Sequence, residues 1–301
     1  MVTIPEKEPV IQSLQPSWHQ PYVECVDILR LDAIHPIVSG NKWYKLKHNI
    51  QYAIDNGYTS ILTFGGAYSN HLIATAAAAK VYSINCIGII RGIHNPDTFT
   101  ETLKQCIDNG MQLEMIAREE YDKKNDATYL EQLSLKHNAP FIIPEGGANI
   151  WGREGSAEIA RYIPDSYTHV CVSVGTGTTL AGIRTSLHSN TNVLGYVPMK
   201  GGTYLTDEIN KYLEQEKQVS YTLFDNWHCG GFGKWNNELI DFMNSFYTTN
   251  NIPLDMVYTA KMMMGIEEQL KSGYFPKEAR ILCIHTGGLQ GNSAVKHLLT
   301  Y

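Results

Sequence analysis

The stretch TSILTFGGAYSNHLIATAAAAKVYSINCIGIIR, residues 59–91, decides the fold. Within it, the β-branched and apolar run Thr59–Phe64 predicts a buried strand, and Gly65-Gly66 interrupts that strand. Asn70–Val81 predicts a helix, and Ile84–Arg91 predicts a second strand. A strand, a helix and a strand of these lengths are typical of a crossover between parallel strands. The sequence therefore predicts an α/β fold.

The same alternation continues on both sides of this stretch. Amphipathic periodicity predicts further helices over residues 44–56, 101–110, 119–137, 154–162 and 178–188. Short β-branched runs predict further strands over residues 113–116, 141–143, 169–174 and 193–197. Thr98 and Glu101 resemble a capping box at the start of one of these helices. In open parallel sheets, ligands bind beyond the carboxyl ends of the strands, so we expect functional residues in the loops that follow strands.

Composition limits the classes of protein to which the chain can belong. It has 301 residues, with 24 Lys+Arg against 30 Asp+Glu and no basic block, which argues against a nucleic-acid-binding protein. The length suggests two domains. No apolar run approaches the ~20 residues of a membrane span, and residues 1–16 contain no apolar signal core. The six cysteines are widely spaced without a C-x-x-C pair, so we expect reduced thiols, no metal site and a cytoplasmic protein.

The sharpest indication of a phosphate site is the segment Val174–Thr179, between a predicted strand and a predicted helix. Its glycines allow several N–H groups to converge, the helix N-terminus adds partial positive charge, and the threonines add hydroxyl donors. The alternative is a glycine-rich turn in which Thr178 caps the helix. A dinucleotide fingerprint does not fit, because Leu180 replaces its third glycine and residues 195–202 contain no acid. No Walker loop occurs either, so a small cofactor with a single phosphate fits better.

Two further segments carry candidate reactive groups. Lys42 follows a Gly-Asn turn and lies toward the apolar side of a predicted helix. A desolvated lysine has a lowered pKa and becomes a nucleophile, whereas a solvated surface lysine is the alternative. The second segment, residues 65–71, follows a strand and opens a helix, so its N–H groups could bind a carboxylate. Ser69 or Asn70 could instead cap the helix, and a lone histidine such as His71 is more often packed than catalytic.

Together these motifs resemble one family. The matching segments, in order, are Gly40-Asn41-Lys42-x-x-Lys45-Leu46, Gly65-Gly66-x-x-Ser69-Asn70-His71, Pro144-x-Gly146-Gly147-x-Asn149, Gly175-Thr176-Gly177-Thr178-Thr179-x-Ala181-Gly182, Asp255-x-Val257-Tyr258-Thr259-x-Lys261 and His285-Thr286-Gly287-Gly288. This set is similar to the family that unites 1-aminocyclopropane-1-carboxylate (ACC) deaminase with D-cysteine desulfhydrase. These are pyridoxal-5′-phosphate (PLP) enzymes of the tryptophan-synthase-β type. The resemblance covers nearly the whole chain, from about Ile28 to Leu289.

The resemblance implies roles for the matching residues. Lys42 would carry PLP covalently, and the residues expected around the cofactor are Lys42, Lys45, Asn70, Gly175, Thr176, Gly177, Thr178, Thr179, Thr259 and Thr286. The residues expected around the substrate are Ser69, Asn70, His71, Phe232 and Tyr258. Those expected to be catalytic are Lys42, Ser69 and Tyr258.

The resemblance also implies an architecture, PLP-dependent fold type II. Residues 1–45 and 149–301 would form a large PLP-binding domain, and residues 46–148 a small mobile domain that closes over the site. A homodimer is expected, because relatives with this fold tend to be dimers. The substrate would be a small amino acid.

Two positions separate the activities within the family. The ACC deaminase branch has Glu after the active-site tyrosine and Leu after the histidine before the last Gly-Gly, whereas this chain has the hydroxyl residues Thr259 and Thr286, as the desulfhydrase branch does. A neutral hydroxyl beside the cofactor supports β-elimination, in which a stable thiolate leaves. We therefore expect a D-cysteine desulfhydrase-like lyase that yields pyruvate, ammonia and sulfide, with ACC deaminase as the alternative.

The native substrate and its stereochemistry stay open, because the chain departs from the family at two places. Tyr44 replaces the usual Arg, and Phe232 replaces the Tyr of a Gly-Tyr-Gly loop. Two alternatives of other classes also stay open. One is a PLP-binding protein without turnover. The other is a serine hydrolase, because Ser39-x-x-Lys42, Tyr68-x-Asn70 and His285-Thr286-Gly287 spell the elements of S-x-x-K enzymes.

Overall fold

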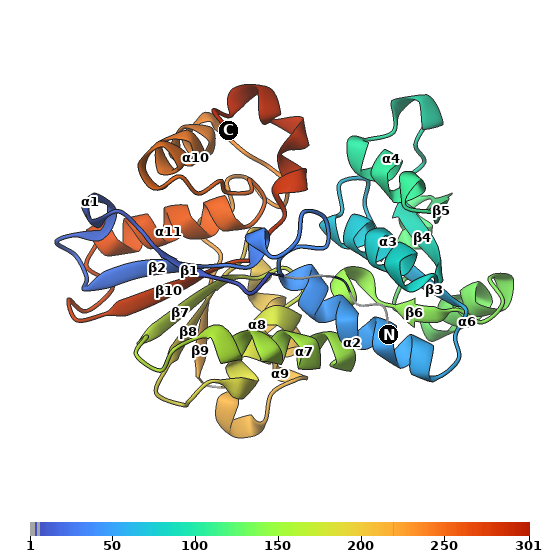
Figure 1. The fold of residues 1–301 in the computed structure, drawn as a ribbon, viewed down its shortest axis with the longest axis horizontal. Helices are drawn as coiled ribbons and strands as arrows, with labels where there is room; N and C mark the ends of the chain where they lie inside the picture. The colour runs from blue at the N-terminus through green and yellow to red at the C-terminus, as the bar shows by residue number, and fades with distance from the viewer. Residues whose placement is uncertain (1–3, 5–6, 219) are drawn as a thin grey trace.

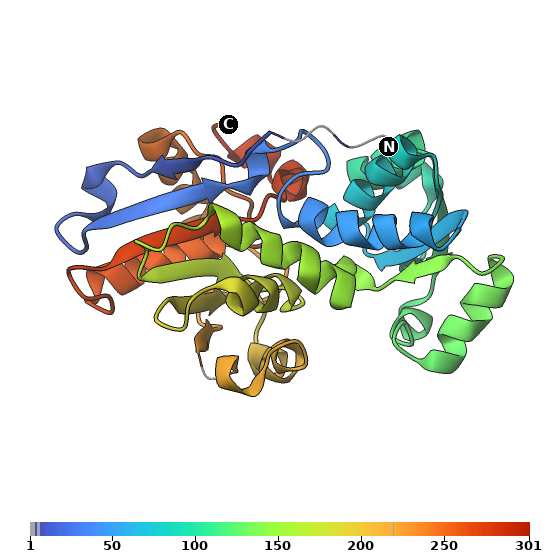
Figure 2. The same ribbon diagram turned by 60° about the horizontal axis from the view of Figure 1, so that its bottom comes forward.

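The computed structural model describes residue 4, residues 7–218 and residues 220–301. In this part of the chain, two sheets form the centres of two lobes (Figure 1), and α2 (Asn41–Asp55) lies between the lobes. A view turned by 60° shows the same separation (Figure 2). The predicted α/β class with parallel-sheet cores is confirmed.

The larger sheet has six strands in the order β1-β2-β10-β7-β8-β9. Their bounds are Ile11–Ser13, Cys25–Arg30, Arg280–His285, His169–Ser173, Asn192–Tyr196 and Tyr221–Phe224. Every neighbouring pair described here is parallel except β1 and β2. Strands β2 and β10 pair although they come from distant parts of the sequence. The parallel pairing also excludes the antiparallel sheet that the serine-hydrolase alternative requires.

The two faces of the larger sheet follow the alternation of side chains along each strand. On β10, Cys283 packs into a core with Met262 and Met263 of α11 (Thr259–Lys271), to which α10 (Asn237–Asn250) also contributes. Leu282 and Ile284 point the other way, into a core shared with α8 (Thr178–Ser186). Figure 1 shows α10 and α11 on one side of the sheet and α7 (Ile150–Ala157) with α8 on the other. Two short helices, α1 (Pro16–His19) and α9 (Leu205–Asn210), lie at its margins.

The smaller sheet is fully parallel, in the order β5-β4-β3-β6. The bounds of these strands are Met111–Ile116, Asn85–Arg91, Ser60–Gly65 and Phe141–Ile143. One face packs against α3 (Asn70–Tyr82) and α4 (Glu101–Asp108), and the other against α5 (Arg118–Tyr121) and α6 (Ala127–Lys136). All four strands fall inside the segment 46–148 expected for the small domain. The boundaries and the mobility of that domain stay predictions.

Local details of two helices illustrate where the structure differs from the sequence prediction. The cap of α4 is Thr100, whose hydroxyl accepts a hydrogen bond from the Leu103 N–H at 3.2 Å, whereas Thr98 lies in a short 3₁₀ turn. The helix expected over 119–137 is divided into α5 and α6. The division arises because the Asp126 carboxylate accepts from the Tyr129 N–H at 2.9 Å and so begins a new helix.

Helices α2, α7 and α8 pack at unusually short range. A Cβ on Gly155 of α7 would lie 1.8 Å from the Tyr44 carbonyl oxygen of α2, and one on Gly182 of α8 would lie 2.6 Å from the Arg153 carbonyl oxygen. Only glycine allows these backbones to approach so closely. Since α2 joins the two lobes, this packing fixes the orientation of α2 against the larger sheet.

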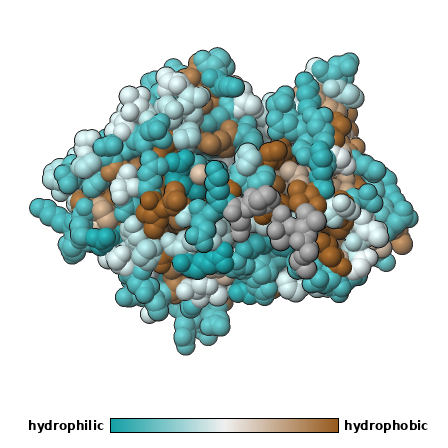
Figure 3. Space-filling view, viewed as in Figure 1, coloured by the Kyte–Doolittle hydropathy of each residue, from teal (hydrophilic) through white to brown (hydrophobic). Residues whose placement is uncertain are grey.

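One face of the molecule is largely hydrophilic, with apolar residues in separate patches (Figure 3). Among the described helices, none has both the length and the apolar character that a membrane span requires. All six cysteines are described, and they form no disulfide.

We expect Gly155→Ala to destabilise the protein, because the new methyl group would overlap the Tyr44 carbonyl oxygen. Overpacking of this kind costs about 1–3 kcal/mol. Denaturant titration followed by circular dichroism measures the effect. Gly291→Ala is the matched control, since its new Cβ would meet its nearest neighbour at an ordinary 3.8 Å. Equal midpoints for the two variants would contradict the proposed close packing.

Candidate active site

The two lobes share a cavity of about 730 Å³. Its lining includes the loops that follow β3, β6, β7 and β10, so the carboxyl ends of strands from both sheets meet there. This is the position at which open parallel sheets bind ligands. Of the residues predicted for the site, those that line this cavity are Lys42, Lys45, Ser69, Asn70, His71, Gly175, Thr176, Gly177, Thr179, Phe232, Tyr258 and Thr286.

Lys42 lies in the first turn of α2, and the start of this helix packs against the backbone of Thr286, near the other end of the sequence. Gly40 has φ +66°, and a Cβ there would lie 2.0 Å from the Thr286 carbonyl oxygen. The Asn41 N–H donates to that same oxygen at 3.2 Å. Burial lowers the pKa of the Lys42 amine from 10.5 to about 8, while the negative charges of Asp255 and Glu145 oppose the shift. A large share of this amine is therefore neutral, and so nucleophilic, near pH 8.

The loop between β7 and α8 forms a polar cradle beside Lys42. Gly177 precedes α8 with φ +81°. Asn41 Nδ2 donates to Thr179 Oγ1 at 2.8 Å, and Lys45 Nζ donates to Thr176 Oγ1 at 3.2 Å. Burial and the nearby Lys42 amine hold the pKa of Lys45 well below its usual value, and no carboxylate pairs with Lys45 in the described chain. A buried lysine beside a helix N-terminus, without an acidic partner, is suited to an anion.

The loop between β3 and α3 supplies the other wall. Ser69 Oγ caps α3 by accepting from the Leu72 N–H at 3.3 Å, so the capping and ligand-binding interpretations of this residue are compatible. Asn70 Nδ2 donates to the Gly288 carbonyl oxygen at 3.4 Å, which joins this loop to the one after β10. Asn70 Oδ1 is buried and has no partner among the described residues.

His71 is neutral, and its tautomer follows from its neighbours. The Thr63 hydroxyl donates its single proton to the Ile143 carbonyl oxygen at 2.8 Å, so it accepts from His71 Nε2, also at 2.8 Å. His71 Nδ1 then carries a lone pair, and it has no hydrogen-bond partner in the described part of the chain. Burial, reinforced by the Lys42 and Lys45 charges, holds the pKa of His71 well below its usual value.

Tyr258 closes the cavity at the start of α11. Its N–H donates to Asp255 Oδ1 at 2.8 Å, and a Cβ on Gly175 would lie 3.2 Å from its hydroxyl oxygen. Burial raises the pKa of the Tyr258 phenol above its usual value, and the charges of Asp255 and Glu145 add to this effect. The phenol therefore stays protonated at neutral pH and can donate a hydrogen bond.

Two predicted residues do not line the cavity. The Thr178 hydroxyl is buried and lies 3.0 Å from the Thr176 hydroxyl. Thr259 is buried behind Asp255, to which its hydroxyl donates at 2.6 Å. The roles of Thr178 and Thr259 in cofactor binding stay predictions. In this geometry the Thr259 hydroxyl helps to hold the Asp255 carboxylate in place.

Sequence reasoning missed some cavity residues that end strands or directly follow them. Ser173 is the last residue of β7, and its hydroxyl is buried without a partner among the described residues. Arg91 ends β4, and Glu145 comes just after β6. All three lie at or just after the carboxyl ends of parallel strands, so the general rule for ligand sites in such sheets indicates them.

These features define an enzyme site for a small phosphorylated cofactor with an amine-reactive group. A family model described as "Pyridoxal-phosphate dependent enzyme" matches residues 24–287. The chain belongs to this family of pyridoxal-phosphate-dependent enzymes, and its cofactor is PLP. The suspected family relationship is confirmed.

Individual relatives make the likeness more specific. A protein of Pyrococcus horikoshii named "Putative 1-aminocyclopropane-1-carboxylate deaminase" is 28% identical over 274 residues, which cover 84% of this chain and 81% of that protein. A protein of Pyrococcus furiosus with the same name is 29% identical over 278 residues, or 84% and 82% of the two chains. A crystal structure described as an ACC deaminase homologue matches with a TM-score of 0.85 and 26% identity, covering 99% of this chain and 96% of that one.

A more distant likeness concerns the fold alone. The processed form of threonine deaminase isoform 2 from Solanum lycopersicum matches with a TM-score of 0.70 at 15% identity, over 99% of this chain and 89% of that one. With the family match, it confirms the predicted fold type II.

The residues of the cavity fit PLP. Lys42 offers the amine that would carry it. Lys45 and the loop from Gly175 to Thr179 offer an anion site that the protein leaves without a negative charge. The buried, unpartnered oxygen atoms of Asn70 and Ser173 offer further polar contacts. When bound, PLP supplies an electron sink for chemistry at the α-carbon of an amino acid.

We expect attachment of PLP to Lys42 to follow the neutral fraction of its amine. With a pKa of about 8, the rate should rise about fivefold between pH 7 and pH 8 and level off above about pH 9. Borohydride trapping of the cofactor-free protein, followed by peptide mass spectrometry, measures this rate. An ordinary lysine would instead gain about tenfold per pH unit up to about pH 10, and such a profile at Lys42 would contradict the lowered pKa.

Proposed function

We propose that this PLP-dependent enzyme is a lyase that removes the β-substituent of a small amino acid, as D-cysteine desulfhydrase does, and releases pyruvate, ammonia and sulfide. The observation that carries the proposal is the meeting of three groups in one cavity: the Lys42 amine, the Tyr258 phenol and the neutral Thr286 hydroxyl. In the ACC deaminase branch that the sequence resembles, a leucine occupies the position of Thr286.

Each protein group has a distinct task in this reaction. The neutral Lys42 amine takes the proton from the α-carbon, which its pKa of about 8 permits near neutral pH. The Ser69 hydroxyl and the N–H groups at the start of α3 bind the substrate carboxylate. The protonated Tyr258 phenol donates its proton to the departing sulfur. With one water molecule, D-cysteine then gives pyruvate, ammonia and hydrogen sulfide.

ACC deaminase is the second candidate, because the relatives and the homologue structure described above carry that name. Ring opening and loss of the amine would give a four-carbon oxo acid in place of pyruvate. Thr259 does not separate the candidates directly, since it is buried behind Asp255 and does not line the cavity. The predicted homodimer and the cytoplasmic location stay predictions.

We expect the PLP-loaded enzyme to release sulfide and pyruvate in equal amounts from D-cysteine, and to form no four-carbon oxo acid from ACC. Chromatography of the oxo acids and a sulfide assay measure these products. Lys42→Ala should abolish both the visible absorbance of the bound cofactor and turnover. Oxo acid from ACC without sulfide from D-cysteine would establish the second candidate. Turnover by Lys42→Ala would overturn both, and a protein that binds PLP but turns over neither substrate would overturn the proposed reaction.

We expect Tyr258→Phe to lower kcat about 10²–10⁴-fold, the usual contribution of a general acid, with a much smaller change in KM. Steady-state kinetics with D-cysteine separate the two constants. Tyr247→Phe in α10 is the control, because that residue packs against Tyr301 and does not line the cavity. An unchanged kcat for Tyr258→Phe would remove the phenol from the reaction.

A further inference from the structure

The cavity carries more aromatic surface than a small amino acid needs. Four of its lining residues are large aromatics that stay exposed: Tyr68 (56%), Tyr204 (55%), Phe232 (52%) and Trp235 (39%). We call these four residues the aromatic rim. A cluster of exposed apolar side chains beside a cavity is typical of a ligand-binding surface.

The part of the rim that carries Phe232 has a built support. Gly230, Gly231 and Gly233 have φ values of 92°, 130° and 67°, which side-chain-bearing residues rarely adopt. Lys261 stabilises this turn, because its buried amine donates to the carbonyl oxygens of His228 at 2.8 Å and Gly231 at 2.9 Å. A lysine amine used in this way fixes the loop, so Phe232 has a defined position.

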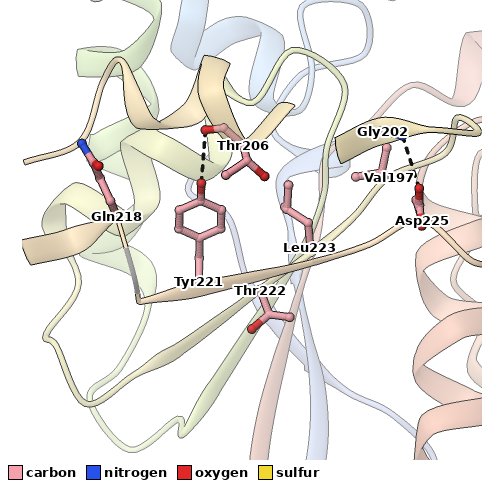
Figure 4. A pocket seen from close by; sticks show the side chains of 8 residues that line it. All are labelled: Val197, Gly202, Thr206, Gln218, Tyr221, Thr222, Leu223 and Asp225. Atoms are coloured by element: carbon pink, nitrogen blue, oxygen red, sulfur yellow. Dashed lines mark hydrogen bonds between the residues drawn. The ribbon is translucent and has the colours of Figure 1, made fainter. Parts of the chain in front are cut away.

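The part that carries Tyr204 is supported separately. Its short 3₁₀ helix, Gly202–Tyr204, is tied to the end of β9 because the Gly202 N–H donates to Asp225 Oδ2 at 3.3 Å (Figure 4). The Tyr204 hydroxyl donates to Met199 Sδ at 3.2 Å. Gly202 of this helix also lines a second cavity of about 320 Å³, whose lining residues, among them Tyr221 and Leu223, are drawn in Figure 4. It holds none of the reactive groups described above.

The rim begins where the leaving group of the proposed reaction would lie. The Phe232 and Tyr258 rings meet edge to face, with their centroids 5.8 Å apart. The Tyr258 hydroxyl lies beside Gly175, which belongs to the segment predicted to bind phosphate. A sulfur atom that takes its proton from Tyr258 therefore lies near Phe232, the rim residue whose ring contacts that of Tyr258.

Two charged residues of the cavity wall, Arg91 and Glu145, already have partners on their own lobe. The Arg91 guanidinium lies 5.9 Å from the centre of the Tyr121 ring, and Glu145 lies 3.5 Å from the Lys124 amine. The exposed aromatic faces of the rim can bury an apolar group at low cost in side-chain entropy. This contrast favours an apolar substituent over a charged one.

We propose that this site also takes S-substituted cysteines with a large aromatic group on sulfur, and that the aromatic rim binds this group. The inference rests on the proposed β-elimination. The α-proton goes to Lys42, the Cβ–S bond breaks with its electron pair on sulfur, and the thiolate takes a proton from Tyr258. Water then replaces the amine, so the thioether and one water give a thiol, pyruvate and ammonia, with no oxidant or reductant.

The test compares S-benzylcysteine with S-methylcysteine, both of which release alkyl thiolates, using both enantiomers and the PLP-loaded enzyme. We expect kcat/KM, from pyruvate release, to be at least tenfold higher for the benzyl compound. Trp235→Ala, and separately Tyr68→Ala, should reduce this preference about tenfold. The control is Trp151→Phe, since Trp151 stacks on Tyr52 and does not line the cavity. A preference that is absent, or that survives both rim variants, would overturn the proposal.

A binding measurement separates this proposal from the proposed reaction. Calorimetry with the Lys42→Ala protein, which cannot turn over, should show tighter binding of S-benzylcysteine than of S-methylcysteine, and loss of the difference in Lys42→Ala/Trp235→Ala. If this binding difference were found but the PLP-loaded enzyme carried out no elimination, the proposed reaction would be overturned. The proposed role of the aromatic rim in binding would still be supported. If the rim variants changed only the oligomeric state in light scattering, the rim would be a subunit interface and the proposal would fail.

Discussion

The site depends on the burial of two amines within one turn of α2. Lys42 and Lys45 line the same cavity, and burial lowers the pKa of each amine. The Lys42 amine is thereby partly neutral and reactive. The Lys45 amine has no carboxylate partner in the described part of the chain, so an anion that binds beside it would stabilise its charged form. A phosphorylated aldehyde fits both residues, because its aldehyde carbon can react with the Lys42 amine and its phosphate can pair with the Lys45 amine.

The rest of the fold keeps that turn of α2 in place. Glycines at the contacts of α2 with α7 and with the loop after β10 bring the backbones together at distances that no other residue permits. Asn41 adds a hydrogen bond to Thr179 across to α8. The loops from the smaller sheet then cover the cavity from the other side, and Asn70 bonds to Gly288 across the gap. The chemistry is carried by few residues, and most of the packing around them serves to exclude water.

Local sequence patterns predicted the parts that depend on local physics. Glycine, apolar periodicity and capping residues indicated α3, β3, β4 and the loop 175–177, and the spacing around Lys42 indicated its apolar environment. The pairing of β2 with β10 was beyond such patterns, because it joins segments about 250 residues apart through contacts that only the folded chain makes. Arg91 and Glu145 differ in this respect, because they lie at or just after the carboxyl ends of parallel strands, where the general rule for ligand sites would have indicated them. The Thr259 hydroxyl donates to Asp255, four residues earlier, and the expected role of Thr259 in cofactor binding stays a prediction.

The contact between Gly40 and Thr286 has a consequence for the order of assembly during synthesis. The turn that positions Lys42 rests on a backbone segment that the ribosome makes about 245 residues later, as the positions 40 and 286 imply. A nascent chain that has exposed Lys42 still lacks the strand β10 and the wall beside it. The smaller sheet, whose strands all lie within 60–143, can be complete while the cavity is still open on one side. The cofactor therefore binds only late in synthesis. A truncated product would expose Lys42 without the pocket that makes it selective for the cofactor.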